Sequence, residues 1–299
     1  MKIGYPCVNL SLKCRSSRTF RLRNYSEERI RETISGNLDC LQKILEFNVD
    51  HNLYFFRITS DLIPFASHPV MNFNWKDYFK TKFEGIGNYI KKNNMRITMH
   101  PGQYTVLNSK RKDVFERSLK ELKYHIEVLD LLKLDQSAKV QVHVGGVYNE
   151  KKESINRFIS RYKKFDNAIK NRLVIENDDK SYHVNDCLEI YNIINIPIIF
   201  DVFHHECYNH QTSMLKALNL VIDTWNAKDG LPILHYSSQK EGKSSGSHAY
   251  SIDIIHFKEF VEKTNDYDFD LMLEIKDKEK SALKALKILK NDNRLRENN

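Results

Sequence analysis

The chain alternates short apolar runs with longer stretches in which apolar residues recur every three or four positions. The run at residues 196–200, Ile-Pro-Ile-Ile-Phe, has no polar alternation, which is typical of a strand covered on both faces. Similar runs predict strands at residues 2–5, 53–58, 95–99, 139–142, 173–175, 231–235 and 268–273. Strands of this kind build parallel sheets, so the pattern predicts an α/β protein.

The stretches between these runs have the period of amphipathic helices. In the first stretch the repeating apolar side chains are Ile30, Ile34, Leu38, Leu41 and Leu45. Ser26 precedes them as the expected N-cap, with glutamates at residues 27–28 in the first turn. Equivalent patterns predict helices at residues 115–129, 214–225 and 281–289.

Eight strands alternating with helices fit an open doubly wound sheet or a closed (β/α)8 TIM barrel. Strands about 4.8 Å apart would separate the outer strands of an open sheet by about 34 Å, too far to share one site. Histidines and carboxylates that could bind a metal ion follow strands as far along the chain as the last one. Only a closed barrel would bring them together, which favours the barrel. No proline- or glycine-rich linker divides the chain, so we predict one TIM-barrel domain at residues 1–290 and a polar, frayed tail at residues 291–299.

Composition adds weaker constraints. No apolar run approaches the roughly 20 residues of a membrane span, and the N-terminus lacks the apolar core of a signal peptide. The five cysteines, at residues 7, 14, 40, 187 and 207, are scattered and form no Cys-x-x-Cys pair. We therefore expect reduced thiols of an intracellular protein, of the cytoplasm or of the nucleoid or nucleus. The formal charge of +8 is compatible with a polyanionic partner.

Histidines and carboxylates gather at the ends of the predicted strands. They are His68, His100, His143, His204, His235, His248, Glu176, Asp201 and Glu274. One such histidine is more often a packing residue than a ligand, but nine candidates at one face are a strong signal. In a closed barrel they would converge at the C-terminal mouth and could hold two or three divalent ions. Ions about 3.5–4 Å apart can clamp a phosphodiester and acidify a water.

Basic loops follow the same strand ends. Their cations are Lys13, Arg15, Arg18, Arg21, Arg23, Lys110, Arg111, Lys112, Lys240 and Lys243. At the mouth they suit binding of a phosphate backbone, although each run alone is more often a solvated loop. Between them Gln103 and Tyr104 could wedge into a distorted duplex, or Tyr104 could pack on its own barrel. A Gly-x-Ser-x-Gly match at residues 242–246 is interpreted as a flexible polar loop, because a nucleophile elbow must be a tight strand-to-helix turn.

Five motifs resemble the UV damage endonuclease family, in order from Lys2 to about Lys280. They are Gly4-Tyr5-Pro6-Cys7-x-Asn9-Leu10, Ile63-Pro64-Phe65-Ala66-Ser67-His68-Pro69, Met99-His100-Pro101-Gly102-Gln103-Tyr104, Ile175-Glu176-Asn177-Asp178 and Asp201-x-x-His204-His205. That family is similar in fold to endonuclease IV and to TIM-barrel sugar isomerases. The resemblance implies an endonuclease that nicks DNA immediately 5′ of cyclobutane pyrimidine dimers, 6-4 photoproducts and in some cases abasic sites, leaving 3′-hydroxyl and 5′-phosphate ends.

The resemblance also implies roles for single residues. The expected metal ligands are His100, His143, Glu176, Asp201, His204, His235, His248 and Glu274, with Glu176, His68 and His235 as catalytic residues. The expected lesion-binding residues are Tyr5, Asn9, Gln103, Tyr104 and Lys276. His68 would contact the phosphate. Some relatives have a lysine where this chain has Ile233, so a third ion would depend mainly on His204, His248 and water.

Our hypothesis is that Glu176 bridges two ions, Mn²⁺ or else Zn²⁺, Co²⁺ or Mg²⁺. His100 and His143 would hold one ion, and the other would be held by Asp201, His235 and Glu274. The expected partner is duplex DNA that contains UV lesions, the protein acts as a monomer, and no membrane is involved. Two alternatives remain at this point: a metal-dependent sugar isomerase on the same barrel, and a damage-binding protein without catalysis.

Overall fold

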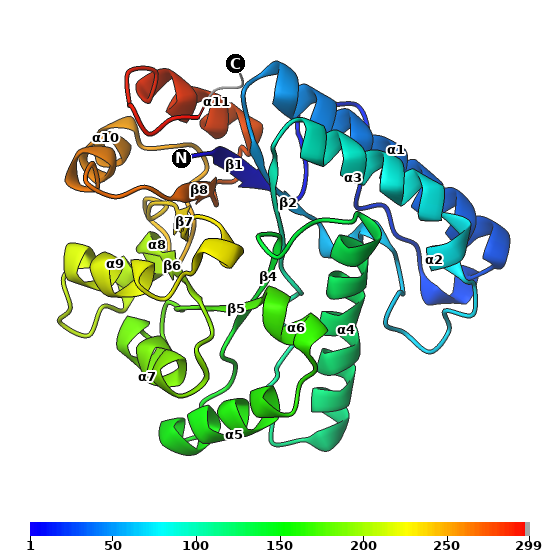
Figure 1. Ribbon diagram of the computed structural model, residues 1–299, viewed down its shortest axis with the longest axis horizontal. Coiled ribbons are helices and arrows are strands. Elements are labelled where there is room, and N and C mark those ends of the chain that lie inside the picture. Colours follow the sequence, from blue (N-terminus) through cyan, green and yellow to red (C-terminus); the bar gives the residue numbers. More distant parts are fainter. Residues whose placement is uncertain (297–299) are drawn as a thin grey trace.

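The computed structural model describes residues 1–296, and their eight parallel strands close into a barrel in sequence order (Figure 1). The strands are β1 (Ile3–Pro6), β2 (Phe55–Ile58), β3 (Arg96–Met99), β4 (Lys139–His143), β5 (Leu173–Glu176), β6 (Ile198–Asp201), β7 (Ile233–Tyr236) and β8 (Asp270–Leu273). Closure occurs where Ile3 of β1 pairs with Leu271 of β8. The prediction of a TIM barrel is therefore confirmed, and the open sheet is excluded.

Helices surround the barrel, and their apolar faces cover the outer side of the strands (Figure 1). They are α1 (Glu27–Asp50), α2 (Trp75–Tyr78), α3 (Lys80–Lys92), α4 (Lys112–Leu131), α5 (Lys151–Lys163), α6 (Asn167–Arg172), α7 (Val184–Ile194), α8 (Val202–Cys207), α9 (Met214–Ile222), α10 (Ile254–Lys263) and α11 (Glu279–Ile288). Short 3₁₀ turns are η1 (Leu22–Asn24), η2 (Ser60–Leu62) and η3 (Ala227–Asp229). As predicted, Ser26 caps α1, its side chain accepting a hydrogen bond from the Arg29 amide.

The inside of the barrel has an apolar floor beneath a polar layer. The floor is one cluster of buried side chains: Phe55, Val174, Ile199, Ile233 and Met272. Two positions further along the same five chain segments come Arg57, Glu176, Asp201, His235 and Glu274. Side chains of a strand alternate between its faces, so residues two positions apart point the same way. The period of two thus stacks ionisable groups on a hydrophobic base at the C-terminal mouth.

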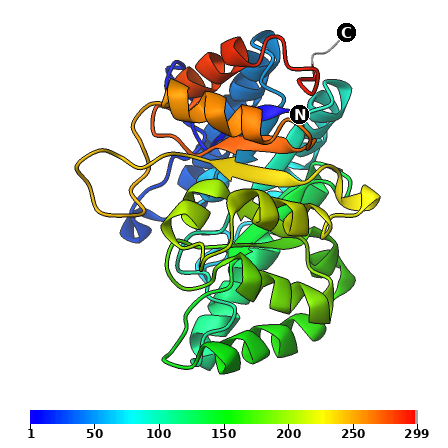
Figure 2. The same ribbon diagram turned by 90° about the vertical axis from the view of Figure 1, so that its left-hand side faces the viewer.

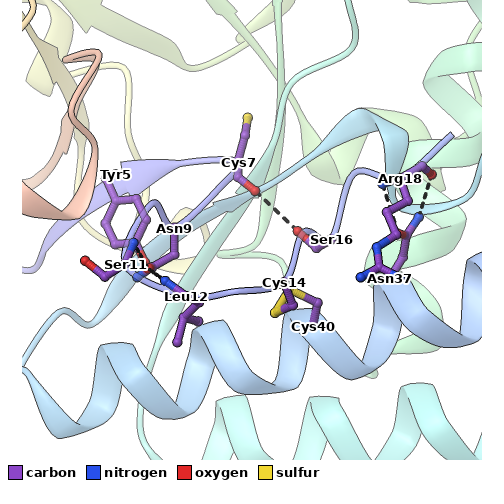
Figure 3. Close-up of a disulfide and its surroundings, with 10 residues drawn as sticks. All are labelled: Tyr5, Cys7, Asn9, Ser11, Leu12, Cys14, Ser16, Arg18, Asn37 and Cys40. Carbon is purple, nitrogen blue, oxygen red and sulfur yellow. Dashed lines mark hydrogen bonds between the residues drawn. A yellow bond between two sulfur atoms is a disulfide. The ribbon is translucent and has the colours of Figure 1, made fainter.

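The expectation of reduced thiols is wrong for one pair, because Cys14 and Cys40 form a disulfide (Figure 3). Cys14 lies in the loop after β1, and this loop runs back along α1, which carries the buried Cys40. The two Cα atoms are 5.7 Å apart, within the span that a disulfide bridges. The cysteines are 26 positions apart in sequence, and only the path of the loop brings them together. Cys7, Cys187 and Cys207 are free thiols.

The sequence predicted a frayed tail from residue 291, but residues 294–296 are held by hydrogen bonds. The Arg294 guanidinium donates to the carbonyl of Thr264, and the Arg296 amide donates to the carbonyl of Met1. These contacts hold residues 294–296 against the end of α10 and against the N-terminus, while residues 297–299 of the predicted tail lie outside the described part. Within residues 1–296, every helix is too short or too polar to pass through a membrane.

Candidate active site

The first group of potential metal ligands combines two histidines from neighbouring strand ends with a carboxylate. The Nε2 atoms of His100 and His143 lie 4.0 and 3.9 Å from Oε2 of Glu176. All three ligand atoms lie within 4.8 Å of one another. Atoms at this spacing can share one cation at bond lengths of about 2.0–2.2 Å.

The second group uses the other oxygen of the same glutamate. Nδ1 of His235 lies 2.6 Å from Oε1 of Glu176, 3.2 Å from Oε1 of Glu274 and 3.9 Å from Oδ2 of Asp201. These four residues form a single group within 4.8 Å, and all but Glu274 are fully buried. Glu176 therefore directs one oxygen to each group, as a bridging carboxylate must. The two groups contain the residues that the sequence assigned to two ions.

His204 and His248 stand beside these groups without entering either. Their ring centroids are 5.9 Å apart, and the ring centroid of His204 is 5.7 Å from that of His143. Nδ1 of His204 is 3.0 Å from the carbonyl of Asn177, and Nδ1 of His248 is 2.9 Å from the carbonyl of Glu274. These backbone contacts orient both rings in the way that is usual for histidine ligands.

His68 lies apart from both groups. It is exposed in the loop after β2, and its Nδ1 accepts a hydrogen bond from the amide of Val70. Neither group of converging ligand atoms found in residues 1–296 includes it. A contact of His68 with a substrate phosphate stays a prediction.

Tyr5 and Asn9 are both buried, and the lesion-binding role expected for them stays a prediction. Tyr5 is fully buried, and its hydroxyl donates to Oδ1 of Asn48 while accepting from Nδ2 of Asn9. Oδ1 of Asn9 in turn accepts from the amides of Ser11 and Leu12 (Figure 3). Tyr5 points from β1 toward α1 rather than into the mouth. Both residues hold the β1–α1 loop in place and are inaccessible to DNA in this structure.

The other lesion-binding candidates are accessible. Tyr104 is 85% exposed on the loop after β3, which rules out the alternative that it packs on its own barrel. Gln103 beside it is exposed too, and so is Lys276 after β8. The loop between β7 and α10, which carries Lys243, projects from one side of the molecule (Figure 2, yellow to orange). Residues 242–246 form turns within it, as predicted, and not a nucleophile elbow.

Sequence reasoning missed three residues that support the ligands. Gln141 donates from Nε2 to Oε2 of Glu176, at 2.9 Å. Asn177 pairs with the backbone of Asp201 through two hydrogen bonds of 2.9 Å each. Arg57 contacts members of the second group. Gln141 and Arg57 could have been found from the period of two, since Gln141 precedes His143 and Arg57 follows Phe55 by that step.

The electrostatics of these side chains favour the cation-binding forms of Glu176, Glu274 and His100. Burial instead raises the pKa of Asp201, and, although burial opposes it, Asp201 raises the pKa of His204 to about 9. Burial opposes ionisation of Glu176, but His235 and His143 hold its pKa well below the ordinary value. Burial also opposes ionisation of Glu274, and Arg57 and His235 lower its pKa. For His100, burial and the neighbouring His143 lower the pKa to about 3, which keeps this ring neutral. Ionised carboxylates and neutral imidazoles are the protonation states that ligate metal ions.

The residues present fit a divalent metal. Three carboxylates, Glu176, Asp201 and Glu274, share the polar layer with Arg57 as their fixed cation. Within the described residues, Oδ2 of Asp201 is fully buried and accepts no hydrogen bond. Such an oxygen is costly unless a cation compensates it. The mixed imidazole and carboxylate donors suit Mn²⁺, Zn²⁺ and similar ions.

Comparison with known proteins places this geometry in context. A model of the family described as UV-endonuclease UvdE matches residues 1–298. The chain is 45% identical over 296 residues to a UV DNA damage endonuclease of Clostridium perfringens (strain 13 / Type A), covering 98% of this chain and 72% of that protein. It is 30% identical to a protein of the same name from Bacillus cereus (strain G9842), and the match covers 96% of this chain and 93% of that protein.

Solved structures agree with these matches. The crystal structure of SacUVDE is 48% identical, with a TM-score of 0.94, and covers 99% of this chain and 100% of that one. The match to a D-psicose 3-epimerase from Clostridium cellulolyticum H10 covers 84% of this chain and 93% of that one, with a TM-score of 0.57 but a sequence identity of only 12%. The second likeness concerns the barrel fold alone.

Proposed function

The chain belongs to the UV-endonuclease UvdE family and is a DNA repair endonuclease, and from this premise we propose the finer chemistry of its site. The substrate is duplex DNA carrying a UV photoproduct, and the bond hydrolysed is the phosphodiester immediately 5′ of the lesion. The products have 3′-hydroxyl and 5′-phosphate ends. The observation that carries this proposal is the pair of ligand groups joined by Glu176.

Two divalent ions, preferably Mn²⁺, would occupy these groups. His100, His143 and Glu176 would hold one ion, and Asp201, His235 and Glu274 would share Glu176 with the other. Such ions supply Lewis-acid polarisation of the phosphodiester and an acidified water as nucleophile. Ile233 is part of the apolar floor, so a third ion would have only His204 and His248 as new protein ligands.

The chain's other residues would bind and orient the DNA. Cations on the loops around the mouth neutralise phosphates on either side of the lesion, which makes affinity dependent on salt. Tyr104 is free to stack on unpaired bases, and Gln103 can donate and accept hydrogen bonds beside it. Damaged bases are cheaper to unstack than sound ones, so the same contacts select the lesion. The protein acts as a monomer, and His68 contacts the scissile phosphate.

The test uses irradiated and untreated supercoiled plasmid with the full chain, in Mn²⁺ and in chelator. We expect nicks only in irradiated DNA with Mn²⁺, and mapping of the ends should place each nick directly 5′ of a photoproduct. Binding to irradiated DNA without any nick would instead favour a damage-binding protein. The alternative function, a metal-dependent sugar isomerase, is supported only by the shared fold. Turnover of free sugars without DNA would be needed to support it.

A further inference from the structure

Arg57 is a buried cation in direct contact with one of the two ligand groups. It lies at the end of β2, where the other ligand strands place a histidine or a carboxylate, and only 4% of it is exposed. Its Nη1 is 2.6 Å from Oε1 of Glu274, and its Nη2 is 2.8 Å from Nε2 of His235. One planar guanidinium therefore fixes two ligands at once.

The contacts of Arg57 are not shared equally between the two groups. Glu274 and His235 belong to the second group, whereas the first consists of His100, His143 and Glu176. The second group has two carboxylates that the first lacks, Asp201 and Glu274, but Glu274 is already paired with Arg57. A cation bound in this group would therefore lie next to a permanent positive charge, which repels it. The guanidinium cannot lose its proton at any working pH, so this repulsion is always present.

We propose that Arg57 is a positioning residue that holds Glu274 and His235 in place, and that its charge weakens cation binding in the second site enough for the first site to fill before it. The inference rests on the proposed two-ion function. The first ion would be retained with the protein, while the second would exchange with free metal.

Two substitutions separate charge from shape. Arg57→Met removes the charge and both polar contacts, and keeps an unbranched, shorter side chain in the barrel. Arg57→Lys keeps the charge and loses the planar fork that contacts both ligands. If charge governs the weak site, only the methionine variant should tighten it.

The experiment is a Mn²⁺ titration of the metal-free full chain, with the free ion followed by electron paramagnetic resonance and the heat by calorimetry. In the wild type we expect a tight and a weak class of site. In Arg57→Met the weak class should tighten by about tenfold or more, while the tight class stays within about twofold. In Arg57→Lys the weak class should stay weak. A single class in the wild type, or a weak class that is unchanged or weaker in Arg57→Met, would overturn the proposal.

Arg96→Met is the matched control, because Arg96 is also a buried arginine, ion-paired with Asp270 at 3.2 Å, but on the opposite end of its strand. It should leave both classes unchanged, and tightening in this variant too would refute a local effect. Circular dichroism checks folding, and Arg57→Gln replaces Arg57→Met if the latter does not fold. Wild-type nicking of irradiated plasmid is measured in parallel. If the wild type nicks irradiated plasmid but the Mn²⁺ titration of Arg57→Met is unaltered, only this inference is rejected. If the wild type neither binds Mn²⁺ nor nicks irradiated plasmid, the proposed function is rejected.

Discussion

The two ends of the barrel both bury charged side chains, but they balance them differently. At the N-terminal end Lys139 pairs with Asp229 at 2.5 Å, and Arg96 pairs with Asp270 at 3.2 Å. At the C-terminal end, within residues 1–296, the three carboxylates of the second group have one ion-paired cation, Arg57, which contacts Glu274. One end is therefore neutralised by its own residues, and the other retains an excess of negative charge.

This difference separates stability from function. A buried pair whose partners match needs nothing from outside, and its loss leaves an uncompensated charge in the core. An uncompensated cluster is instead a site for a cation, and in TIM barrels such sites lie at the C-terminal face. Substitutions at the two ends should accordingly move different measurements.

The largest effect is expected for Glu176→Gln at the C-terminal end. The amide cannot bridge two cations, so nicking of irradiated plasmid at saturating Mn²⁺ should fall by about 10³-fold or more. Removing one of three crowded carboxylates should not lower the melting temperature of the metal-free protein. Near-normal nicking by the folded variant would remove Glu176 from the mechanism.

Lys139→Met should do the opposite at the N-terminal end. It leaves the buried Asp229 without its cation and removes a hydrogen bond to the carbonyl of Asn171. We expect a loss of about 3–5 kcal/mol in the free energy of unfolding, measured in urea. The kcat of the fraction that remains folded should stay close to wild type. A stable variant with impaired kcat would mean that the two ends are not separate in function.

Acid should destabilise the protein through a group at neither end. His125 of α4 is fully buried, and burial lowers its pKa from 6.5 to about 4. The unfolded chain then binds the proton more readily, so this stability is complete above pH 6.5 and declines as pH falls toward 4. Between pH 7 and 5 the loss from His125 should be about 2 kcal/mol. His125→Leu should reduce the pH dependence of urea unfolding by that amount, and an unchanged pH dependence would show that other groups dominate.

The smallest effect is expected on the projecting loop. Replacing Lys240 and Lys243 by alanine should weaken binding to irradiated and intact duplex alike, because phosphate contacts carry no sequence or lesion information. The slope of log affinity against log salt should decrease by about 2 if both lysines contact phosphates. Fluorescence anisotropy at several salt concentrations measures this, and an unchanged slope would place the DNA elsewhere on the mouth.

Much of the fold and of the ligand set was determined by the sequence alone. Apolar runs such as residues 196–200 predict buried strands because backbone geometry and burial are local properties. The change from Phe200 to Asp201 at a strand end marks the functional face for the same reason. Nine ligand candidates at strand ends could thus be named before their positions were known, and the structure gathers six of them into the two groups.

Only the tertiary structure decided how these residues are used. The direction of Tyr5 toward α1, the pairing of Cys14 with Cys40, and the contact of Arg57 with Glu274 and His235 all join residues that are distant in sequence or depend on which way a side chain turns. Local pattern carries no information on such contacts, because they arise when strands close into a barrel and bring separate segments within a few ångströms.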